Sequence, residues 1–273
     1  MPAKNLSRPK AKIAESSADA GHIELDYYYD NHPTKEDLMA ESPAQSELVD
    51  YLKAVLKWQY DQENWYVVSN IGIYQTLDLL EYPIAPDLAV FIGTVVTKEE
   101  RHGLRSWKTL RDNRPAPSVV FEISSKDTWP EDLNLKPEQY RQMGVKEYFA
   151  YDPNVPTFWT ERRKRTEVRL RGWSYEAGRT IELAANEQGW LWSKALNSWL
   201  VPDTEMLRLY DSDKQLRLTK AEAEEAAKIV EQAAKEAERT AKEAERTAKE
   251  AERTAKERAW AKLRELGVDP ESL

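Results

Sequence analysis

The chain of 273 residues has no cysteine, only three histidines and only nine glycines. Without cysteine it can form neither a disulfide nor a thiolate metal site. The histidines, His22, His32 and His102, form no zinc-like pair, and their scarcity argues against a Ser-His-Asp triad. No glycines are spaced as in a phosphate-binding loop, and no Gly-x-Ser-x-Gly elbow occurs. Any metal would therefore have oxygen ligands, which favours Mg²⁺ or a similar hard cation.

Long hydrophobic runs are also missing. No segment approaches the roughly 18 apolar residues that a membrane-spanning helix needs. The first 21 residues, MPAKNLSRPKAKIAESSADAG, are basic and then small and polar, without the apolar centre of a secretory signal. We therefore expect a soluble cytoplasmic protein with no membrane contact.

Positive charge is concentrated in two stretches of a chain whose net charge is −8. The net charge argues against indiscriminate nucleic-acid binding. Residues Lys98–Arg114 and Glu161–Arg171 are nevertheless rich in lysine and arginine. Each stretch could follow a phosphate backbone or simply be a solvated basic loop.

Composition divides the chain into three regions. Residues 1–21 have the character of a disordered tail, and residues 22–212 that of a mixed α/β domain. Residues 213–273 are dominated by Ala, Glu, Lys and Arg and predict a long helix. The heptad AKEAERT occurs there three times, from residue 234 to 254. Its alanines fit both a shallow coiled coil, which would make a homodimer, and a solvated single helix.

The middle region alternates between strand and helix patterns. Helices are expected at Pro43–Tyr60 and Glu131–Met143, the second ending at Gly144. Strands are expected at His22–Tyr29, Trp65–Ser69, Ile71–Gln75, Ile84–Ile92, Pro117–Ser124 and Val145–Tyr151, with a hairpin at Pro156–Arg171 and outer strands in Trp173–Leu183. The strand–helix–strand order from 118 to 151 predicts a parallel crossover unit.

Glu122 is the most informative single residue, because it stands in the apolar strand Val119–Ile123. A carboxylate there costs several kcal/mol unless it is paired or binds a cation. The two interpretations are a metal ligand and a buried Glu matched to an arginine or a backbone donor.

Asp87 follows Pro86 and begins the next apolar strand upstream. A Pro-Asp pair alone is common in turns. Two acids at the ends of neighbouring strands, however, could converge on one hard cation that activates water and stabilises a phosphate transition state. Asp87 and Glu122 are therefore the candidate metal ligands.

The segments APDLAVF, PSVVFEISS and LKPEQYRQMGVKEYFAYDP together resemble the Uma family of restriction endonucleases, a bacterial branch of the PD-(D/E)XK nuclease superfamily. The resemblance covers about residues 30–200. It implies a restriction-endonuclease-like αβββαβ core with a mixed sheet, which binds Mg²⁺ (or Mn²⁺) and cleaves DNA. It also implies that Asp87 and Glu122 are the catalytic acids and that the backbone carbonyl of Ile123 contacts the metal.

This sequence departs from the superfamily pattern at Ser124, where a lysine is expected. Lys136, on the following helix, resembles the relocated lysine of this branch and is the preferred third catalytic residue. Its ammonium would orient water and offset developing charge. Lys126 is the competitor, because it would share the strand face of Glu122 if the strand continued.

Three further residues are weaker candidates. Glu47 and its neighbour Gln45 lie on the first predicted helix, where the superfamily often places another acid. Tyr140 lies one helical turn beyond Lys136 and could share its cleft or simply cover the sheet.

The leading hypothesis is a Mg²⁺-dependent DNA endonuclease, acting as a homodimer. A catalytically silent module for binding or assembly is the alternative, and an activity on RNA or nucleotides is a third.

Overall fold

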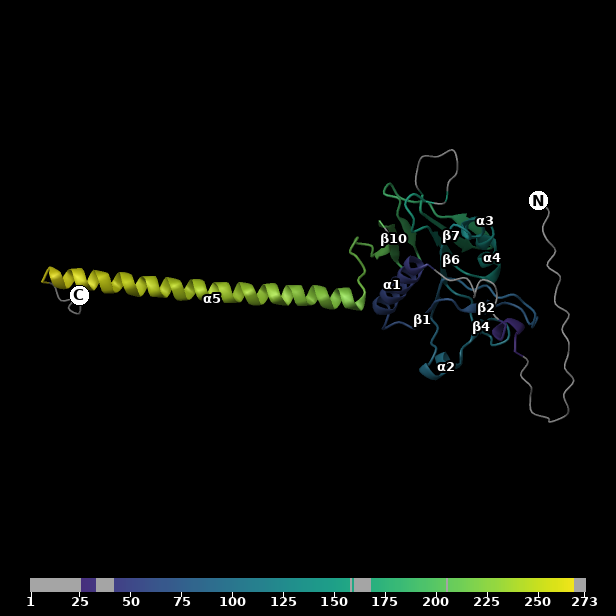
Figure 1. Ribbon diagram of the computed structural model, residues 1–273, viewed down its shortest axis with the longest axis horizontal. Coiled ribbons are helices and arrows are strands. Elements are labelled where there is room, and N and C mark those ends of the chain that lie inside the picture. Colours follow the sequence, from purple (N-terminus) through teal and green to yellow (C-terminus); the bar gives the residue numbers. More distant parts are fainter. Residues whose placement is uncertain (1–25, 33–41, 158, 160–167, 205, 268–273) are drawn as a thin grey trace.

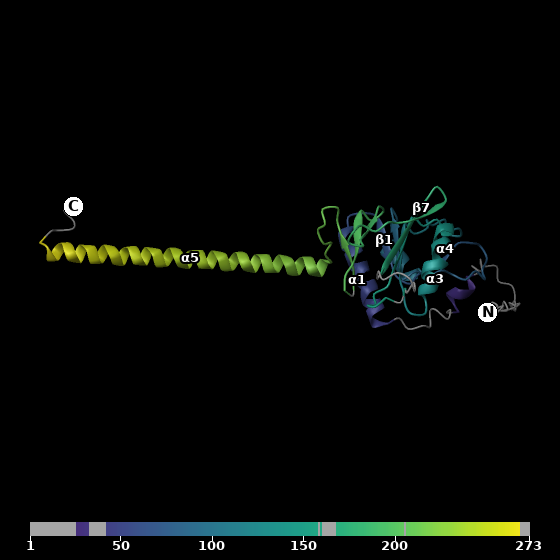
Figure 2. The same ribbon diagram turned by 90° about the horizontal axis from the view of Figure 1, so that it is seen from above.

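The computed structural model describes residues 26–32, 42–157, 159, 168–204 and 206–267. It shows a globular α/β part from which one long helix projects as a straight rod (Figures 1 and 2). The tail predicted for residues 1–21 lies outside the described residues.

A six-stranded mixed sheet forms the centre of the globular part. Its strands, in spatial order, are β1 (Trp65–Val68), β3 (Leu88–Ile92), β5 (Val119–Ile123), β6 (Glu147–Tyr151), β7 (Leu170–Glu176) and β8 (Arg179–Glu182). Strands β5 and β6 are parallel, as the crossover pattern predicted, and every other neighbouring pair is antiparallel. With α1 before β1 and helices between β5 and β6, the order is the predicted αβββαβ arrangement.

Helix α1 (Pro43–Gln59) covers one face of this sheet. Its start is fixed by Ser42, whose side chain accepts from the backbone of Gln45 in a capping box. Its buried side consists of Leu48, Val49, Leu52, Val55 and Leu56. These residues share one hydrophobic cluster with the inward side chains of β3, β5 and β6, so the apolar face of α1 is what holds the helix on the sheet.

The opposite face is covered by aromatic side chains and by short elements. They are β2 (Gly72–Tyr74), β4 (Ser106–Lys108), α3 (Trp129–Asn134) and α4 (Lys136–Met143). Helix α2 (Lys98–Gly103), which precedes β4, has no buried residue. Strands β2 and β4 pair in parallel as a separate two-stranded sheet. Trp107, Tyr140 and Tyr148 are completely buried in this second cluster.

The helix expected at Glu131–Met143 is two helices, α3 and α4, joined at Leu135. Pro137 explains the break, because proline lacks a backbone N–H and fits only in the first turn of a helix. Lys136 therefore stands at the first position of a new helix. Gly144 ends α4 in the left-handed conformation (φ +89°), as predicted.

Two strand predictions need correction. Within the described part of His22–Tyr29 there is no strand, and Tyr28–Asp30 form a short 3₁₀ helix, η1. The strand expected at Ile84–Ile92 begins only at Leu88, and Ile84 makes an isolated bridge to Ile73. Pro86 accounts for the late start, because it cannot donate to a strand ladder. Most of the hairpin predicted at Pro156–Arg171 lies outside the described residues.

A three-stranded antiparallel sheet was not predicted at all. It consists of β9 (Leu191–Ser193), β10 (Ser198–Pro202) and β11 (Leu207–Tyr210). Glu147, buried at the start of β6, accepts hydrogen bonds from the Ser193 hydroxyl and from the backbone N–H of Lys194 at 2.9 Å. These contacts fasten the small sheet to the central one.

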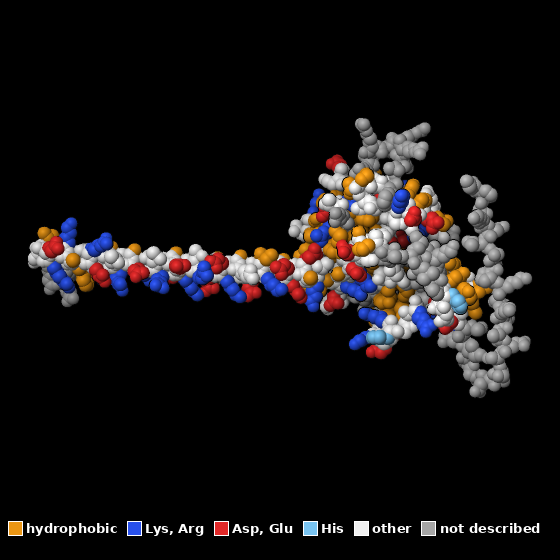
Figure 3. All heavy atoms as spheres, in the orientation of Figure 1, with side chains coloured by type: hydrophobic (Ala, Val, Ile, Leu, Met, Phe, Trp, Pro, Cys, Tyr) orange, Lys and Arg blue, Asp and Glu red, His pale blue; other side chains and the backbone are white. Residues whose placement is uncertain are grey.

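Helix α5 (Lys220–Glu265) is 46 residues long and has no buried residue. Its first turn is fixed by Thr219 and Glu222 in a capping box, and Arg208 of β11 contacts Glu222 at 2.8 Å. Beyond this base the helix is surrounded by solvent, with charged side chains along much of its length (Figure 3).

None of the helices described here is both long and apolar enough to span a bilayer. The cytoplasmic location stays a prediction.

Gly172 of β7 provides a test of the core. A Cβ atom there would lie 2.7 and 2.8 Å from ring carbons of Phe149 and 3.1 Å from a methyl carbon of Leu191. We expect Gly172→Ala to lower the free energy of unfolding by about 1–3 kcal/mol, the usual cost of overpacking, as measured by urea denaturation. Gly103→Ala, where nothing lies within 4 Å of the added carbon, is the matched control. Equal stability of the two variants would contradict this packing.

Candidate functional site

The candidate site lies where β3 begins and β5 ends. These strands are antiparallel neighbours, so the first residue before β3 meets the last residues of β5. Asp87 Oδ2 accepts a hydrogen bond of 2.6 Å from the backbone N–H of Ile123. The structure thus brings Asp87 beside the segment that carries Glu122.

Glu122 points to the α4 side of the sheet and is 3% exposed. One carboxylate oxygen accepts a hydrogen bond from the hydroxyl of Tyr140, and the other lies 3.0 Å from the ammonium of Lys136. Tyr140 is fully buried and packs against Tyr148, with ring centroids 4.9 Å apart. Tyr140 therefore does both things that its position suggested: its ring covers the sheet, and its hydroxyl contacts Glu122 beside Lys136.

Asp132 of α3 is a member of the cluster that the sequence reasoning missed. It is 1% exposed, and its Oδ1 lies 2.8 Å from the Lys136 ammonium. Its Oδ2 accepts from the hydroxyls of Ser124 at 2.8 Å and Thr128 at 3.2 Å. The i,i+4 spacing of Asp132 and Lys136 was the available signal.

Ser124 stands where the resemblance led us to expect a lysine. It is completely buried, and its hydroxyl is committed to Asp132. Lys126 lies in a turn after β5 has ended and is exposed. The strand continuation that would have placed Lys126 beside Glu122 does not occur.

The two candidates on α1 lie differently. The side-chain amide of Gln45 donates a 3.0 Å hydrogen bond to the backbone carbonyl of Ile123, the carbonyl predicted to contact metal. Glu47 is exposed, and no interaction brings it to Asp87 or Glu122 among the described contacts. Gln45 is therefore the α1 residue that reaches the site.

The cluster carries excess negative charge. Three carboxylates, Asp87, Glu122 and Asp132, face one ammonium, that of Lys136. Burial and then the charge of Glu122 raise the pKa of Asp87 well above its ordinary value of 3.8. Burial also raises the pKa of Glu122, against the opposing effect of Lys136.

Lys136 stays charged in this setting. Burial alone would lower its pKa, but Glu122 and Asp132 outweigh that effect and raise the pKa above its ordinary value. The ammonium offsets one of the three negative charges. The remaining two formal charges equal the charge of one divalent cation.

The donor types at this point fit a hard cation. Carboxylate and carbonyl oxygens are what Mg²⁺ prefers in proteins, usually one or two carboxylates with water completing the shell. Across the described residues, no three acidic or histidine side chains converge as a chelating group. Asp87, Glu122 and the carbonyl of Ile123 are oxygen donors of this kind.

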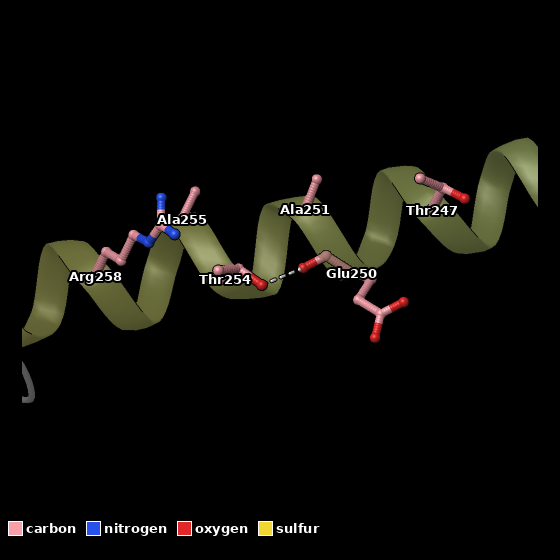
Figure 4. Close-up of a pocket in the computed structure, with 6 residues that line it drawn as sticks. All are labelled: Thr247, Glu250, Ala251, Thr254, Ala255 and Arg258. Carbon is pink, nitrogen blue, oxygen red and sulfur yellow. Dashed lines mark hydrogen bonds between the residues drawn. The ribbon is translucent and has the colours of Figure 1, made fainter.

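A shallow depression on α5 is not part of this site. It is outlined by Thr247, Ala251, Thr254 and neighbouring residues of the same helix, and no second element faces it (Figure 4). A surface formed by one helix alone cannot enclose a small ligand.

Comparison with known proteins identifies the family. The family model described as "Uma2: Putative restriction endonuclease" matches residues 35–191, which is more than half of the chain. The chain belongs to this family, as its resemblance to the Uma endonucleases predicted, and the family supports a nuclease-like function.

A solved structure from Anabaena variabilis, described as "a putative nuclease belonging to DUF820", is also similar. It is 12% identical with a TM-score of 0.37, and the alignment covers 58% of this chain and 76% of that one. No curated protein matches the chain.

The raised pKa of Asp87 predicts how the free energy of unfolding depends on pH. Ionising a carboxyl group whose pKa rises on folding costs stability, and the cost grows as the pH rises above the ordinary value of 3.8. We expect Asp87→Asn to raise the free energy of unfolding at pH 7, with divalent metal removed, by about 0.5–2 kcal/mol. The gain should vanish below about pH 4, where the carboxyl group is protonated in both states.

Urea denaturation at several pH values measures this effect. The exposed Glu47→Gln is the control and should change little at any pH. A loss of stability in Asp87→Asn at pH 7 would contradict the excess negative charge.

Proposed function

We propose that this member of the Uma2 family is a Mg²⁺-dependent DNA endonuclease whose catalytic residues are Asp87, Glu122 and Lys136. One observation carries the proposal: the Glu122 carboxylate, buried in the sheet, is held by an ammonium and a tyrosine hydroxyl, and a second acid, 35 residues earlier in the chain, accepts a hydrogen bond from the backbone of the residue after Glu122. This arrangement leaves negative charge that a divalent cation would balance. A merely structural Glu would need no second, uncompensated acid.

Asp87, Glu122 and the carbonyl of Ile123 would hold the Mg²⁺ (or Mn²⁺). A bound ion supplies Lewis-acid polarisation of a phosphoryl oxygen and a water of lowered pKa. Gln45 donates to the Ile123 carbonyl, and the Ile123 N–H donates to Asp87. These two hydrogen bonds hold the carbonyl and the Asp87 carboxylate in position.

Lys136 would orient the attacking water and stabilise the charge that develops on the phosphate. Its position at the first residue of α4 places the ammonium over the strand end, and Asp132 and Glu122 hold it there. Asp132 acts through Lys136 and is a positioning residue. Lys136 reaches Glu122 from a helix and not from the strand itself, and Asp132 holds its ammonium in that position.

Nicking of supercoiled plasmid tests the activity. With Mg²⁺ or Mn²⁺ the chain should convert supercoiled DNA to open circles, and Asp87→Ala or Glu122→Ala should abolish the reaction. Lys136→Met should lower the rate by about 100-fold or more, in the range of a lost electrostatic stabiliser. The exposed Lys126→Met is its matched control and should stay within a few-fold of the parent.

Calorimetric titration with Mn²⁺ separates binding from chemistry. Lys136→Met should still bind the ion, whereas Glu122→Ala should not. Nicking that survives both acid substitutions would overturn the assigned site. Ion binding without nicking of DNA or RNA would favour the alternative of a catalytically silent binding module.

We further propose that the chain is a homodimer paired through α5. Thr240, Thr247 and Thr254 each turn the hydroxyl back to a carbonyl four residues earlier on the same helix, at 2.8–2.9 Å. Each hydroxyl is therefore satisfied within the helix. Together with the alanines of the heptads they form a continuous face of small residues, suited to close packing against a second copy.

Sedimentation equilibrium tests the assembly. The parent should have twice the chain mass of 31.6 kDa, and Ala244→Glu with Ala251→Glu should dissociate it, because charge would enter the small-residue face. Arg246→Glu with Arg253→Glu adds glutamates on the opposite face and should leave the dimer intact. A monomeric parent would refute pairing through α5 and leave a solvated single helix.

A further inference from the structure

A second hollow lies along the outer edge of the central sheet, beside the C-terminal half of α1. Gln45 lies in the first turn of the same helix. The hollow is a groove of about 420 Å³ between α1, β1 and the segment that leads into α2. One wall is formed by Lys53 and Lys57 of α1, and the other by Val95, Val96 and Arg101. None of these residues belongs to the candidate site.

Three cations, Lys53, Lys57 and Arg101, face this groove. The described part of the chain has no salt bridge to Lys53, Lys57 or Arg101. The hydrogen bonds of these side chains go to neutral groups: Lys53 donates to the Ser69 hydroxyl at 2.8 Å, and Arg101 donates to the Val96 carbonyl at 3.0 Å. The Arg101 guanidinium also lies 5.9 Å from the ring centroid of Tyr66.

Lys57 shows the electrostatic consequence. Burial lowers its pKa, and the two charges that act on it, Lys53 and Arg101, are both positive and lower it further. Asp61 and Glu63 also line the groove, but both are exposed and follow the end of α1. In Figure 3, lysine and arginine side chains gather over the region between α1 and α2.

The groove runs along the edge of the sheet. Strand β1 is the edge of the six-stranded sheet, and Trp65–Val68 line the groove. Lysine and arginine side chains placed along such an edge are a suitable surface for the oxygens of a phosphate chain.

We propose that this groove binds phosphate groups of a nucleic-acid strand that extends away from the candidate site. The inference rests on the proposed function, because it takes the substrate to be a nucleic acid. Helix α1 supplies the connection: Gln45 contacts the site, and Lys53 and Lys57 follow about 12 and 18 Å further along the axis, at 1.5 Å per residue. The groove is therefore within reach of the same strand, a few nucleotides from the bond to be cut.

Fluorescence anisotropy of a labelled 20-nucleotide strand, and of its duplex, tests the groove without any cleavage. Binding is measured in EDTA, over a series of salt concentrations. Lys53→Gln with Lys57→Gln should weaken binding by about tenfold at low salt and reduce the salt slope by about 1.4–1.8, the value for two lost phosphate contacts. Lys146→Gln with Lys194→Gln removes two exposed lysines elsewhere on the globular part and should leave both quantities unchanged.

Acetylation of lysines provides a readout that needs no variant. In the parent protein the bound strand should protect Lys53 and Lys57 but not Lys146 and Lys194.

Inorganic phosphate added at millimolar concentration distinguishes the sources of the ligand. Complete displacement of the strand would assign the groove to free phosphate, and weak competition would assign it to a polymer backbone.

Unchanged affinity and salt slope in the Lys53 and Lys57 variant, with no protection of either lysine, would overturn the inference. Because this measurement uses no metal and no cleavage, its outcome is independent of nicking. Nicking of DNA together with binding that does not depend on Lys53 and Lys57 would refute only the groove proposal. Binding that depends on these lysines without nicking would refute only the proposed catalytic activity.

Discussion

The ion pair between Lys136 and the buried carboxylate of Glu122 is the interaction on which the rest of the site depends. A carboxylate at the centre of an apolar sheet would be costly if unpaired. Lys136 meets this requirement from the next helix because α3 ends and α4 begins at Leu135. The proline that interrupts the helix therefore also determines where the cation lies.

The same pair explains why Asp132 and Ser124 have their positions. Lys136 is held from two sides, by Glu122 and by Asp132, and Asp132 is held in turn by Ser124 and Thr128. Such a network fixes each member only when all of them are satisfied. Ser124, where the resemblance predicted a lysine, instead holds Asp132, which contacts Lys136 one helical turn further on.

The sequence predicted the parts of the fold that local patterns determine. The apolar face of α1, the parallel pair β5 and β6, and the turn at Gly144 all follow from spacing and residue type. Burial of Glu122 could be predicted because its neighbours in β5 are all apolar. The small sheet β9–β11 could not, because its short strands depend on the distant Glu147 for their attachment. Asp132 was missed for a similar reason, since its partners converge only once α3 and α4 fold back over the strand end.

Helix α5 has a geometric consequence for a paired molecule. At 1.5 Å per residue its 46 residues span about 70 Å, which is roughly the length of 20 base pairs of duplex DNA at 3.4 Å each. If two such helices ran in opposite directions, the globular parts would lie at the two ends of the rod, two helical turns of DNA apart. If they ran in the same direction, the globular parts would lie side by side at one end. The direction of the two helices would thus determine whether a pair of sites meets one short stretch of duplex or two separated ones.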